Sequence, residues 1–450
     1  MAFTWGAARA GCVVVPINPH FKEREMAYVL NDSAVRVILV DAISAPTVSA
    51  VRPQVASLTR VVSAPARVPG ADASAAEMLA THTTVAAIED CDPSSEVMRV
   101  YTSGTEGVTK GARHTHDTIH YITSAWIDNV HKMQPDDICL CPLPLFLMFA
   151  NDMLFPALDI GATTVLVTGF TSGAEILDLM TRDAVTWYGG VPTTYLRMIQ
   201  DHDPARHRIQ LRQSFSAGAK MPADRIQEWE RISGGPFIEF YGSTEVPTLS
   251  QVMEMPRKAG SVGWPIGNLQ VHLVDDYDEP VPDGQPGEIV VRGALVCEGY
   301  WNQPEGTARA FRGGWFHTGD IAVRDRNGEY TIVDRKKDMI IRGGVNLYPA
   351  EIESTLYEHP QVAMCAVVGR PHADLGEVPI AFVQPISTTP VRPDDLREFM
   401  RERLAHVKCP EEFRIVDSLP MNENGKLLKR VLRQQLRDEG PNRLEVQPGG

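Results

Sequence analysis

The 450-residue chain has little that would tie it to a membrane or to an oxidising compartment. Its longest apolar region, from Ile138 to Phe149, contains Pro142 and Pro144 and is too short to cross a bilayer. No charged start is followed by an apolar run and a small-residue cleavage site, so no signal peptide is predicted. The seven cysteines are odd in number and scattered, which favours a reducing environment. We therefore expect a cytoplasmic protein.

Clustered cations and paired metal ligands are also missing. The formal net charge is −14 and no cluster of Lys and Arg stands out, which excludes a partner held through a phosphate backbone, such as a nucleic acid. Cys139 and Cys141 lie two residues apart without a second pair, so they predict a buried strand rather than a zinc site. No internal repeats occur.

The chain length and the residue patterns that are present predict an α/β protein of two or three domains. Strand-like runs at 35–40 and 163–167 alternate with helical patterns at 175–181 and from Pro222 onward. Such alternation predicts largely parallel sheets covered by helices. From about Gly260 the pattern changes to short strands with Asp-Gly and Asn-Gly turns, which predicts an antiparallel, β-rich part.

The C-terminal hundred residues read as a separate α+β module. A helix opens near Pro349 and ends before Pro360, strands follow at 362–368 and 381–385, and 392–404 is an amphipathic helix. A module of this size is within the usual range for a domain.

The run from Tyr101 to Gly111, YTSGTEGVTKG, combines hydroxyls, three glycines and Lys110. Glycine lets backbone N–H groups approach anionic oxygens, and lysine adds a mobile positive charge. A strand at 97–101 precedes the run, so the loop leaves a sheet edge. It is not the Walker pattern. The run therefore predicts a phosphate loop, with an ordinary turn as the alternative.

Further segments carry polar groups at strand ends or in glycine turns. Glu245 follows a strand at 236–240 and could hold Mg²⁺ on a triphosphate, although a solvated loop acid is the alternative. Asp320 follows a glycine turn and is suited to accept from two ribose hydroxyls, or is a plain turn aspartate. The charged run 334–338 and the flexible glycine loop 342–348 are also consistent with a solvated surface and a connector. Lys426, after Gly425, is by itself an ordinary surface lysine.

In this order and spacing the motifs resemble the acyl-adenylate-forming superfamily of acyl- and aryl-CoA synthetases, peptide-synthetase adenylation domains and luciferases. The resemblance extends from Gly11 to Lys426. It implies an ATP-dependent carboxylate–CoA ligase that uses Mg²⁺ and coenzyme A, forms acyl-AMP with release of pyrophosphate, and then forms the thioester. It also implies a large domain over 1–336 and a small mobile domain over 337–450, with the hinge at Lys337.

The resemblance also implies the role of each matching residue. Thr244 would lie near the α-phosphate, Glu245 would hold Mg²⁺, and Lys426 would drive adenylation. Asp320 and Arg335 would bind the ribose. The residues expected to cradle the β- and γ-phosphates are Thr102, Ser103, Gly104, Thr105, Gly107 and Lys110; those expected to wall the adenine are Gly218, Ala219, Tyr241 and Gly242; and those expected to line the pantetheine tunnel are Gly343 and Gly344.

The acyl pocket implied by the resemblance is lined from the segments around Leu147–Phe149, Trp187–Gly189, Ala217–Gly218 and Ser243–Pro247. No Lys, Arg or Asp occurs in its segments, which disfavours a second carboxylate or an amino acid as substrate. Trp187 and Tyr188 either narrow the pocket towards a ring or belong to the core. The expected lining residues are Leu147, Met148, Phe149, Trp187, Tyr188, Ala217, Ser243 and Val246.

The sequence departs from the family pattern in a few places. Glu106 stands where Thr is usual, Thr109 stands where Pro is usual, and Leu147 stands where many members carry His, which favours a cyclic or aromatic acid. Family members also usually have several dozen residues before the part that matches Met1 to Gly11. Two alternatives therefore stay open: loading of a carrier-protein thiol, and a nucleotide-binding remnant without catalysis. We expect a monomer or homodimer with a small-molecule acid as partner.

Overall fold

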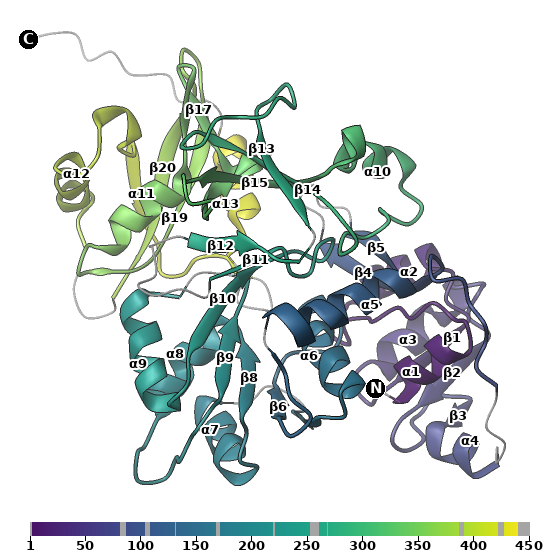
Figure 1. The fold of residues 1–450 in the computed structure, drawn as a ribbon. Helices are drawn as coiled ribbons and strands as arrows, with labels where there is room; N and C mark the ends of the chain where they lie inside the picture. Colours follow the sequence, from purple (N-terminus) through teal and green to yellow (C-terminus); the bar gives the residue numbers. More distant parts are fainter. Residues whose placement is uncertain are drawn as a thin grey trace, which may run out of the picture. The chain divides into compact units, whose positions relative to one another are not determined.

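A computed structural model describes residues 2–81, 87–103, 109–130, 132–167, 172–218, 221–252, 261–267, 269–386, 391–421 and 427–439. The chain divides into two compact units, one of residues 1–272 with 290–318 and one of residues 273–289 with 319–450 (Figure 1). The expected domain boundary at 336/337 concerns motion about a hinge and stays a prediction. No helix in the described ranges is long and apolar enough to cross a membrane.

The first unit contains a parallel sheet flanked by helices, as the alternating sequence pattern predicts. Strands β7, β6, β8, β9 and β10 are parallel neighbours in that order, and β11 and β12 continue the sheet antiparallel. The strands of this sheet are β6 (Ile138–Cys141), β7 (Thr163–Leu166), β8 (Trp187–Gly190), β9 (Gln213–Ser216), β10 (Phe237–Tyr241), β11 (Ser250–Val252) and β12 (Ser261–Pro265).

Helices cover both faces of this sheet (Figure 1). The capping box of Ser172 and Glu175 starts α7, Pro222 precedes α9, and Gly234 in a left-handed conformation ends it. The helices around the sheet are α5 (His116–Ser124), π-helix η2 (Ala125–Val130), α6 (Met148–Asp159), α7 (Gly173–Arg182), α8 (Pro192–Asp201) and α9 (Ala223–Ser233); α10 (Pro304–Ala310) and η3 (Arg312–Gly314) come later in the chain.

Alternation along the strands separates two aromatic clusters. Tyr188 faces α7–α9, where it packs with Tyr195 and Trp229. Trp187, the preceding residue, lies on the opposite face with Phe215. The remaining rings of that second cluster are Trp126, Phe149 and Phe240.

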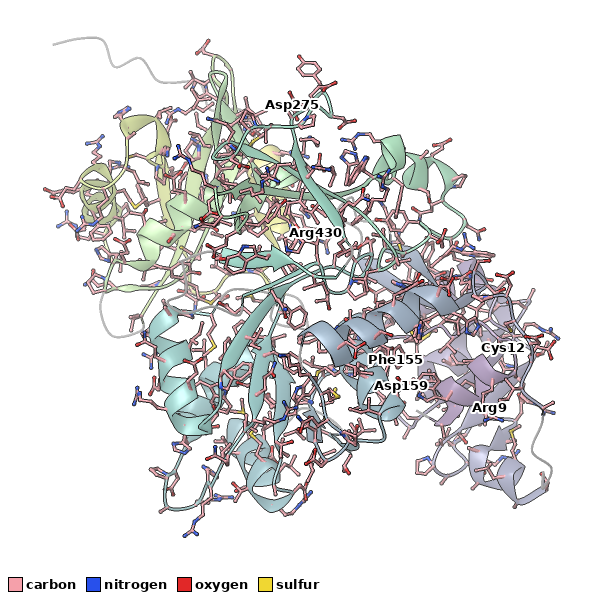
Figure 2. The ribbon with its side chains drawn as sticks, viewed as in Figure 1. Arg9, Cys12, Phe155, Asp159, Asp275 and Arg430 are labelled. Carbon is pink, nitrogen blue, oxygen red and sulfur yellow. The ribbon has the colours of Figure 1, made fainter. Side chains whose placement is uncertain are left out.

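A buried acid lies in α6, which passes over the second aromatic cluster. Asp152 is 1% exposed, and burial raises the pKa of its carboxyl well above the usual range. On the same helix, Phe155, which is labelled in Figure 2, contacts Trp5 of helix α1 (Ala2–Arg9) with 5.2 Å between ring centroids.

The N-terminal part of the first unit has a core of its own. Strands β1, β2 and β3 form a small parallel sheet, and Met26, Val48 and Val61 pack beside it. A hairpin of β4 and β5 follows. The elements are α1 (Ala2–Arg9), α2 (Glu23–Asp32), β1 (Val37–Val40), α3 (Ala45–Val51), η1 (Arg52–Gln54), β2 (Arg60–Ser63), β3 (Ala73–Ser74), α4 (Ala75–Thr81), β4 (Glu96–Ser103) and β5 (Thr109–Thr115).

The second unit is built on the long antiparallel pair β19–β20, as the sequence predicts for the C-terminal module. Val367 points to a core under α11 and α12, and Val368 points to a core under α13. The elements are β13 (Gln270–Val274), β14 (Pro286–Arg292), β15 (Phe316–Arg324), β16 (Tyr330–Arg335), η4 (Lys336–Asp338), β17 (Ile340–Arg342), β18 (Val345–Leu347), α11 (Pro349–Tyr357), β19 (Val362–His372), β20 (Gly376–Pro385), α12 (Pro393–Arg401), η5 (His406–Lys408), β21 (Glu412–Ile415) and α13 (Lys429–Asp438), of which β13, β14 and β15 cross the boundary between the units.

Candidate functional site

Two predicted segments lie at the carboxyl edge of the parallel sheet in the first unit. Ala217 and Gly218 follow β9, and the run from Tyr241 to Val246 follows β10, the parallel neighbour of β9. Carboxyl ends of neighbouring parallel strands share one edge, which is where α/β proteins bind ligands. Gly218 has φ +85°, a left-handed conformation that favours glycine.

The turn after β10 depends on Gly242. A Cβ at this position would lie 2.1 Å from the carbonyl oxygen of Pro247, much closer than any real contact. The same turn is closed by the Ser243 N–H, which donates to the Val246 carbonyl at 2.8 Å, and by the Leu249 N–H, which donates to the Tyr241 carbonyl at 2.8 Å. The sequence Tyr-Gly-Ser-Thr-Glu therefore folds into a tight loop that presents Thr244 and Glu245.

His114 of β5 ties this loop to the hairpin that carries the phosphate loop. Its Nε2 donates to the backbone carbonyl of Thr244 at 2.9 Å. The ring is fully buried, and burial lowers the pKa of His114 from 6.5 to about 4, so the imidazole is neutral at physiological pH. The segment from Lys110 to His114 and the segment with Thr244 are thus held as one structure.

Replacement of His114 by glutamine is expected to reduce the acid sensitivity of the fold. Between pH 6.5 and about 4 the unfolded chain binds a proton at His114 that the folded chain does not, so the free energy of unfolding falls as the pH falls. At pH 4.5 this loss amounts to about 2–3 kcal/mol relative to pH 7. Glutamine can still donate to Thr244 but does not titrate. Urea unfolding at the two pH values measures the difference.

His120→Gln, which changes an exposed histidine of α5, is the control for the His114 experiment. It should leave the pH dependence of unfolding as in the parent protein. Equal losses of stability in His114→Gln and the parent protein would contradict a neutral, buried His114.

Glu245 and Lys110 meet at Tyr300. The Tyr300 hydroxyl donates to Glu245 Oε1 at 2.8 Å, and Lys110 Nζ lies 5.1 Å from the centroid of the Tyr300 ring. Burial and the nearby Glu245 carboxylate raise the pKa of the Tyr300 hydroxyl, which keeps it a donor. A carboxylate and an ammonium from distant parts of the chain are thereby placed next to one tyrosine, the carboxylate at its hydroxyl and the ammonium near its ring.

This group fits Mg²⁺ bound with a phosphate ligand. Within the described ranges no three or more His, Cys, Asp or Glu side chains gather into a metal cage. Mg²⁺ prefers oxygen ligands and is commonly held by one or two carboxylates together with substrate phosphates. Glu245 supplies such an oxygen, and Tyr300 engages only Oε1 of the carboxylate.

The second unit brings together the two residues expected to bind the ribose. Asp320 and Arg335 face each other across the β15–β16 pair, with Arg335 Nε 2.8 Å from Asp320 Oδ1. Asp320 is 4% exposed. Beside them Glu288 accepts from the Gly319 N–H at 3.1 Å and pairs with Lys336 at 3.1 Å. Gly319, which precedes Asp320, and Lys336, which follows Arg335, are therefore both held by Glu288 of β14.

The residues expected at the hinge and in the pantetheine tunnel lie in the same unit. Lys336 also pairs with Asp276 at 2.9 Å; burial lowers the pKa of its ammonium, but the hydrogen bonds to Asp276 and Glu288 outweigh burial and raise it. Lys337 is exposed in η4. Gly343 and Gly344 are exposed and form the two-residue turn that joins β17 to β18. Their φ angles are 55° and 82°, and glycine is favoured in a turn of this type because both positions need a positive φ. The expected flexible loop is thus a β-hairpin.

The residues expected to line the acyl pocket separate into two groups. Phe149 and Trp187 lie in the aromatic cluster on the α6 face of the sheet, with Leu147 and Met148 just before Phe149. The assignment of Tyr188 is wrong, because its side chain lies on the other face of the sheet, against α7–α9. The core alternative therefore holds for Tyr188. Ala217, Ser243 and Val246 lie at the carboxyl edge described above.

Several predicted residues lie outside the described ranges. They are Gly104, Thr105 and Gly107 of the phosphate loop, Ala219, and Lys426, and the Ser103 side chain is likewise not described. Thr102, the preceding residue on β4, pairs with Lys110 of β5. The strand ends that flank the phosphate loop therefore lie side by side.

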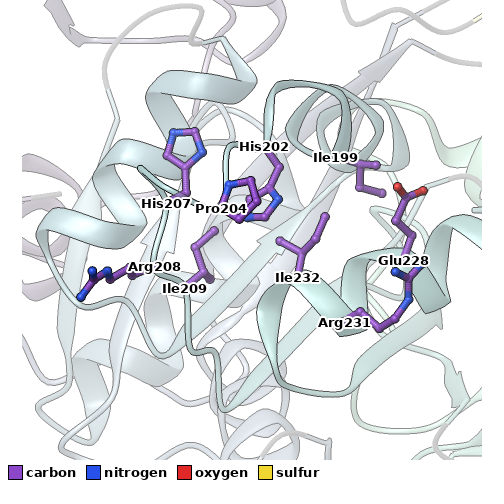
Figure 3. A pocket seen from close by; sticks show the side chains of 9 residues that line it. All are labelled: Ile199, His202, Pro204, His207, Arg208, Ile209, Glu228, Arg231 and Ile232. Atoms are coloured by element: carbon purple, nitrogen blue, oxygen red, sulfur yellow. The ribbon is translucent and has the colours of Figure 1, made fainter.

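A shallow hollow on the first unit lies apart from all of these residues (Figure 3). Ile199, His202 and His207 line it from the end of α8 and the loop that follows, and Glu228 and Ile232 line it from α9. None of the residues predicted to bind nucleotide or acid contributes to it.

Comparison with known proteins decides the family. Residues 1–301 match the family model described as AMP-binding enzyme, and residues 351–426 match the AMP-binding enzyme C-terminal domain. The chain belongs to the AMP-binding enzyme family. The first match alone covers more than half of the chain.

Relatives of this AMP-binding enzyme include CoA ligases. A feruloyl-CoA synthase from an Amycolatopsis species is 36% identical over 438 residues, which cover 96% of this chain and 85% of the relative. A long-chain-fatty-acid–CoA ligase from Mycobacterium tuberculosis is 34% identical over 442 residues, which cover 96% of this chain and 84% of the relative.

Solved structures support the same fold. ATP-bound MatB from Rhodopseudomonas palustris has a TM-score of 0.87 at 29% identity, over 97% of this chain and 86% of that chain. The anthranilate CoA ligase AuaEII in complex with anthranoyl-AMP has a TM-score of 0.85 at 26% identity, over 96% and 84%. These matches confirm the family and the α/β fold inferred from the sequence, while the roles of individual residues stay predictions.

The sequence pattern of this AMP-binding enzyme did not single out three polar residues that contact the predicted site segments. His114 and Tyr300 contact the Thr244–Glu245 loop, and in the second unit Glu288 contacts Gly319 and Lys336, the chain neighbours of Asp320 and Arg335. His114 lies within a strand and Tyr300 within an aromatic pair with Trp301, both of which are common in cores. The sequence does give a hint for Glu288, because this glutamate lies inside an apolar strand and a buried carboxylate needs a hydrogen-bonding or charged partner.

Proposed function

We propose that this protein is an ATP-dependent carboxylate–CoA ligase. In the first step it joins a carboxylic acid to AMP with release of pyrophosphate, and in the second the thiol of coenzyme A attacks the acyl-AMP to form a thioester. The observation that carries the proposal is that Glu245 and Lys110 both contact Tyr300, next to the strand ends that flank the glycine-rich loop. This arrangement suits a magnesium triphosphate. Membership of the AMP-binding enzyme family and the similarity to named CoA ligases support it.

The proposed chemistry assigns a distinct task to each group. Mg²⁺, when held by Glu245, neutralises charge on the phosphates. Lys110 adds positive charge at the end of the phosphate loop, and the Thr244 hydroxyl donates towards the α-phosphate. Negative charge grows on the α-phosphate as pyrophosphate leaves, and fixed donors and cations stabilise it best where water is excluded. Lys426 supplies the cation for this step and bridges to the attacking carboxylate.

The second step needs a different arrangement of the same residues. Thiol attack on acyl-AMP does not need the Lys426 ammonium. In the proposed mechanism, a rotation about Lys337 withdraws Lys426 and brings the Gly343–Gly344 hairpin to the site. The exposed hairpin with its side-chain-free turn suits a narrow passage for a flexible thiol arm. Asp320 and Arg335 hold the ribose in both steps.

The substrate we propose is an aromatic, alicyclic or medium aliphatic acid. The expected pocket segments lack Lys, Arg and Asp, which leaves no partner for a second charged group. Phe149 and Trp187 belong to a cluster of rings, which suits a flat apolar acid. The similarity to a feruloyl-CoA synthase supports an aromatic acid.

The test is acid-dependent exchange of labelled pyrophosphate into ATP, run over a panel of aliphatic, alicyclic and aromatic acids. We expect exchange with a subset of the panel, and thioester of the matching mass after addition of coenzyme A. Exchange without a CoA thioester would instead favour transfer to a carrier-protein thiol. ATP binding by calorimetry without exchange for any acid would contradict the ligase and favour a nucleotide-binding remnant.

A further inference from the structure

We propose that Tyr300 is a positioning residue for the Glu245 carboxylate, and that it links this carboxylate to the phosphate-loop hairpin. This inference rests on the proposed function, in which Glu245 holds Mg²⁺. Tyr300 itself touches neither the metal nor the reacting atoms. It acts through the orientation of Glu245.

The contact between the two side chains is direct. The Tyr300 hydroxyl donates to Glu245 Oε1 at 2.8 Å, a normal length for a hydrogen bond to a carboxylate. Both side chains are half-buried, so solvent competes less with this bond than at an open surface. Because Oε1 is engaged, Oε2 is the oxygen left for a cation.

The backbone around Tyr300 is fixed against both parts of the site. We call residues 297–301 the brace. The Trp301 N–H donates to the Gly111 carbonyl at 2.9 Å, and the Arg113 N–H donates to the Gly299 carbonyl at 3.0 Å. At the other end the Cys297 N–H donates to the Glu245 carbonyl at 2.9 Å. The brace therefore joins β5 to the Glu245 loop through its backbone, and the Tyr300 hydroxyl adds the side-chain connection.

The neighbouring Trp301 anchors one end of the brace through its own side chain. The Arg99 guanidinium lies 3.6 Å from the centroid of the Trp301 ring, and the Trp301 indole N–H donates to the Asp32 carbonyl at 2.8 Å. These contacts anchor the residue next to Tyr300. The position of the Tyr300 hydroxyl is therefore set by the fold and not by Glu245.

A carboxylate oriented in advance binds a metal more tightly. A glutamate side chain loses rotamer freedom when it coordinates an ion, and a hydrogen bond that has already restricted it reduces that cost. Loss of a hydrogen-bond partner of a metal ligand typically weakens metal binding about 10–100-fold. The ring of Tyr300 also faces Lys110, so the same residue sets the spacing between the metal ligand and a cation of the phosphate loop.

The test separates metal-dependent from metal-independent binding of ATP. Calorimetry gives the affinity for ATP with excess Mg²⁺ and with EDTA, and the ratio of the two is the gain due to the metal. In Tyr300→Phe, which keeps the ring beside Lys110 and removes only the hydroxyl, we expect this gain to fall about 10-fold or more. The affinity in EDTA should stay within about threefold of the parent protein.

Two comparisons make the result specific. Tyr195→Phe removes a buried hydroxyl that donates to the Phe215 carbonyl at 2.7 Å in the same unit, and it should leave the gain unchanged. In a Glu245→Gln background the gain should already be low, and adding Tyr300→Phe should lower it no further. Glu245→Asp shortens the side chain and draws the carboxylate back from the Tyr300 hydroxyl, so it should lower the gain as Tyr300→Phe does. It provides a second test if Tyr300→Phe folds poorly.

The possible outcomes distinguish the inference from the function on which it rests. An unchanged gain in both Tyr300→Phe and Glu245→Asp overturns the positioning role and leaves the ligase proposal intact. Equal losses in Tyr195→Phe and Tyr300→Phe also overturn it, since a general loss of stability then explains both. If the parent protein binds ATP neither with Mg²⁺ nor in EDTA, the proposed function itself fails.

Discussion

Replacement of Lys426 by alanine is expected to lower acid-dependent ATP–pyrophosphate exchange about 10²–10³-fold, while thioester formation from supplied acyl-AMP stays within a few-fold of the parent protein. The physical reason is that charge grows on the α-phosphate only in the first step, and one fixed donor to such a charge contributes about 3–4 kcal/mol to lowering the barrier. The two half-reactions are measured separately, the first by exchange and the second by release of AMP from synthetic acyl-AMP.

Lys408→Ala is the matched control, because it removes an ammonium that pairs with Glu351 at 2.6 Å in the same unit. It should change neither half-reaction. If Lys426→Ala slows both half-reactions equally, the two steps share one arrangement of the site, and the proposed rotation about Lys337 is wrong.

Replacement of Gly242 by alanine is expected to have the next largest effect. The new Cβ would lie 2.1 Å from the Pro247 carbonyl oxygen and 2.8 Å from the Val246 carbonyl oxygen, so the backbone of the loop must move. Overpacking of this kind costs about 1–3 kcal/mol and at times more. Because the loop carries Thr244 and Glu245, we expect ATP affinity with Mg²⁺ to fall about 10-fold or more, together with a lower melting temperature.

Gly6→Ala is the control for this change, since a Cβ on Gly6 of α1 meets nothing within 4 Å. It should leave ATP affinity as it is and slightly stabilise its helix. Unchanged melting temperature and ATP affinity in Gly242→Ala would show that the loop adapts, and that the close approach of Pro247 is not required for binding.

The elements that carry the site follow from local sequence patterns. Apolar runs such as 163–167 gave β7, and Pro349 marked the start of α11, because short-range periodicity and backbone restriction decide these features. The order of motifs was enough to identify the family, since most motifs sit in turns whose chemistry is local. Gly242 belongs to such a turn, whereas Asp320 lies within strand β15.

Contacts between distant segments could not be read in the same way. Nothing near Tyr300 in the sequence indicates that its hydroxyl reaches Glu245, and nothing near His114 points to Thr244. Tyr188 was placed in the pocket because the strand pattern alone does not tell which of two adjacent aromatic residues faces which side of a buried strand. The burial of Asp152 could not be predicted either, because an aspartate in a helix is far more often exposed than buried.

The brace has a consequence for how the protein is made. Chains emerge from the ribosome N-terminal end first, and early segments begin to fold as they appear. The phosphate-loop hairpin and the Glu245 loop are synthesised well before residues 297–301, which join them. A nascent chain that stops short of Trp301 therefore lacks the full set of backbone contacts by which the brace joins these parts.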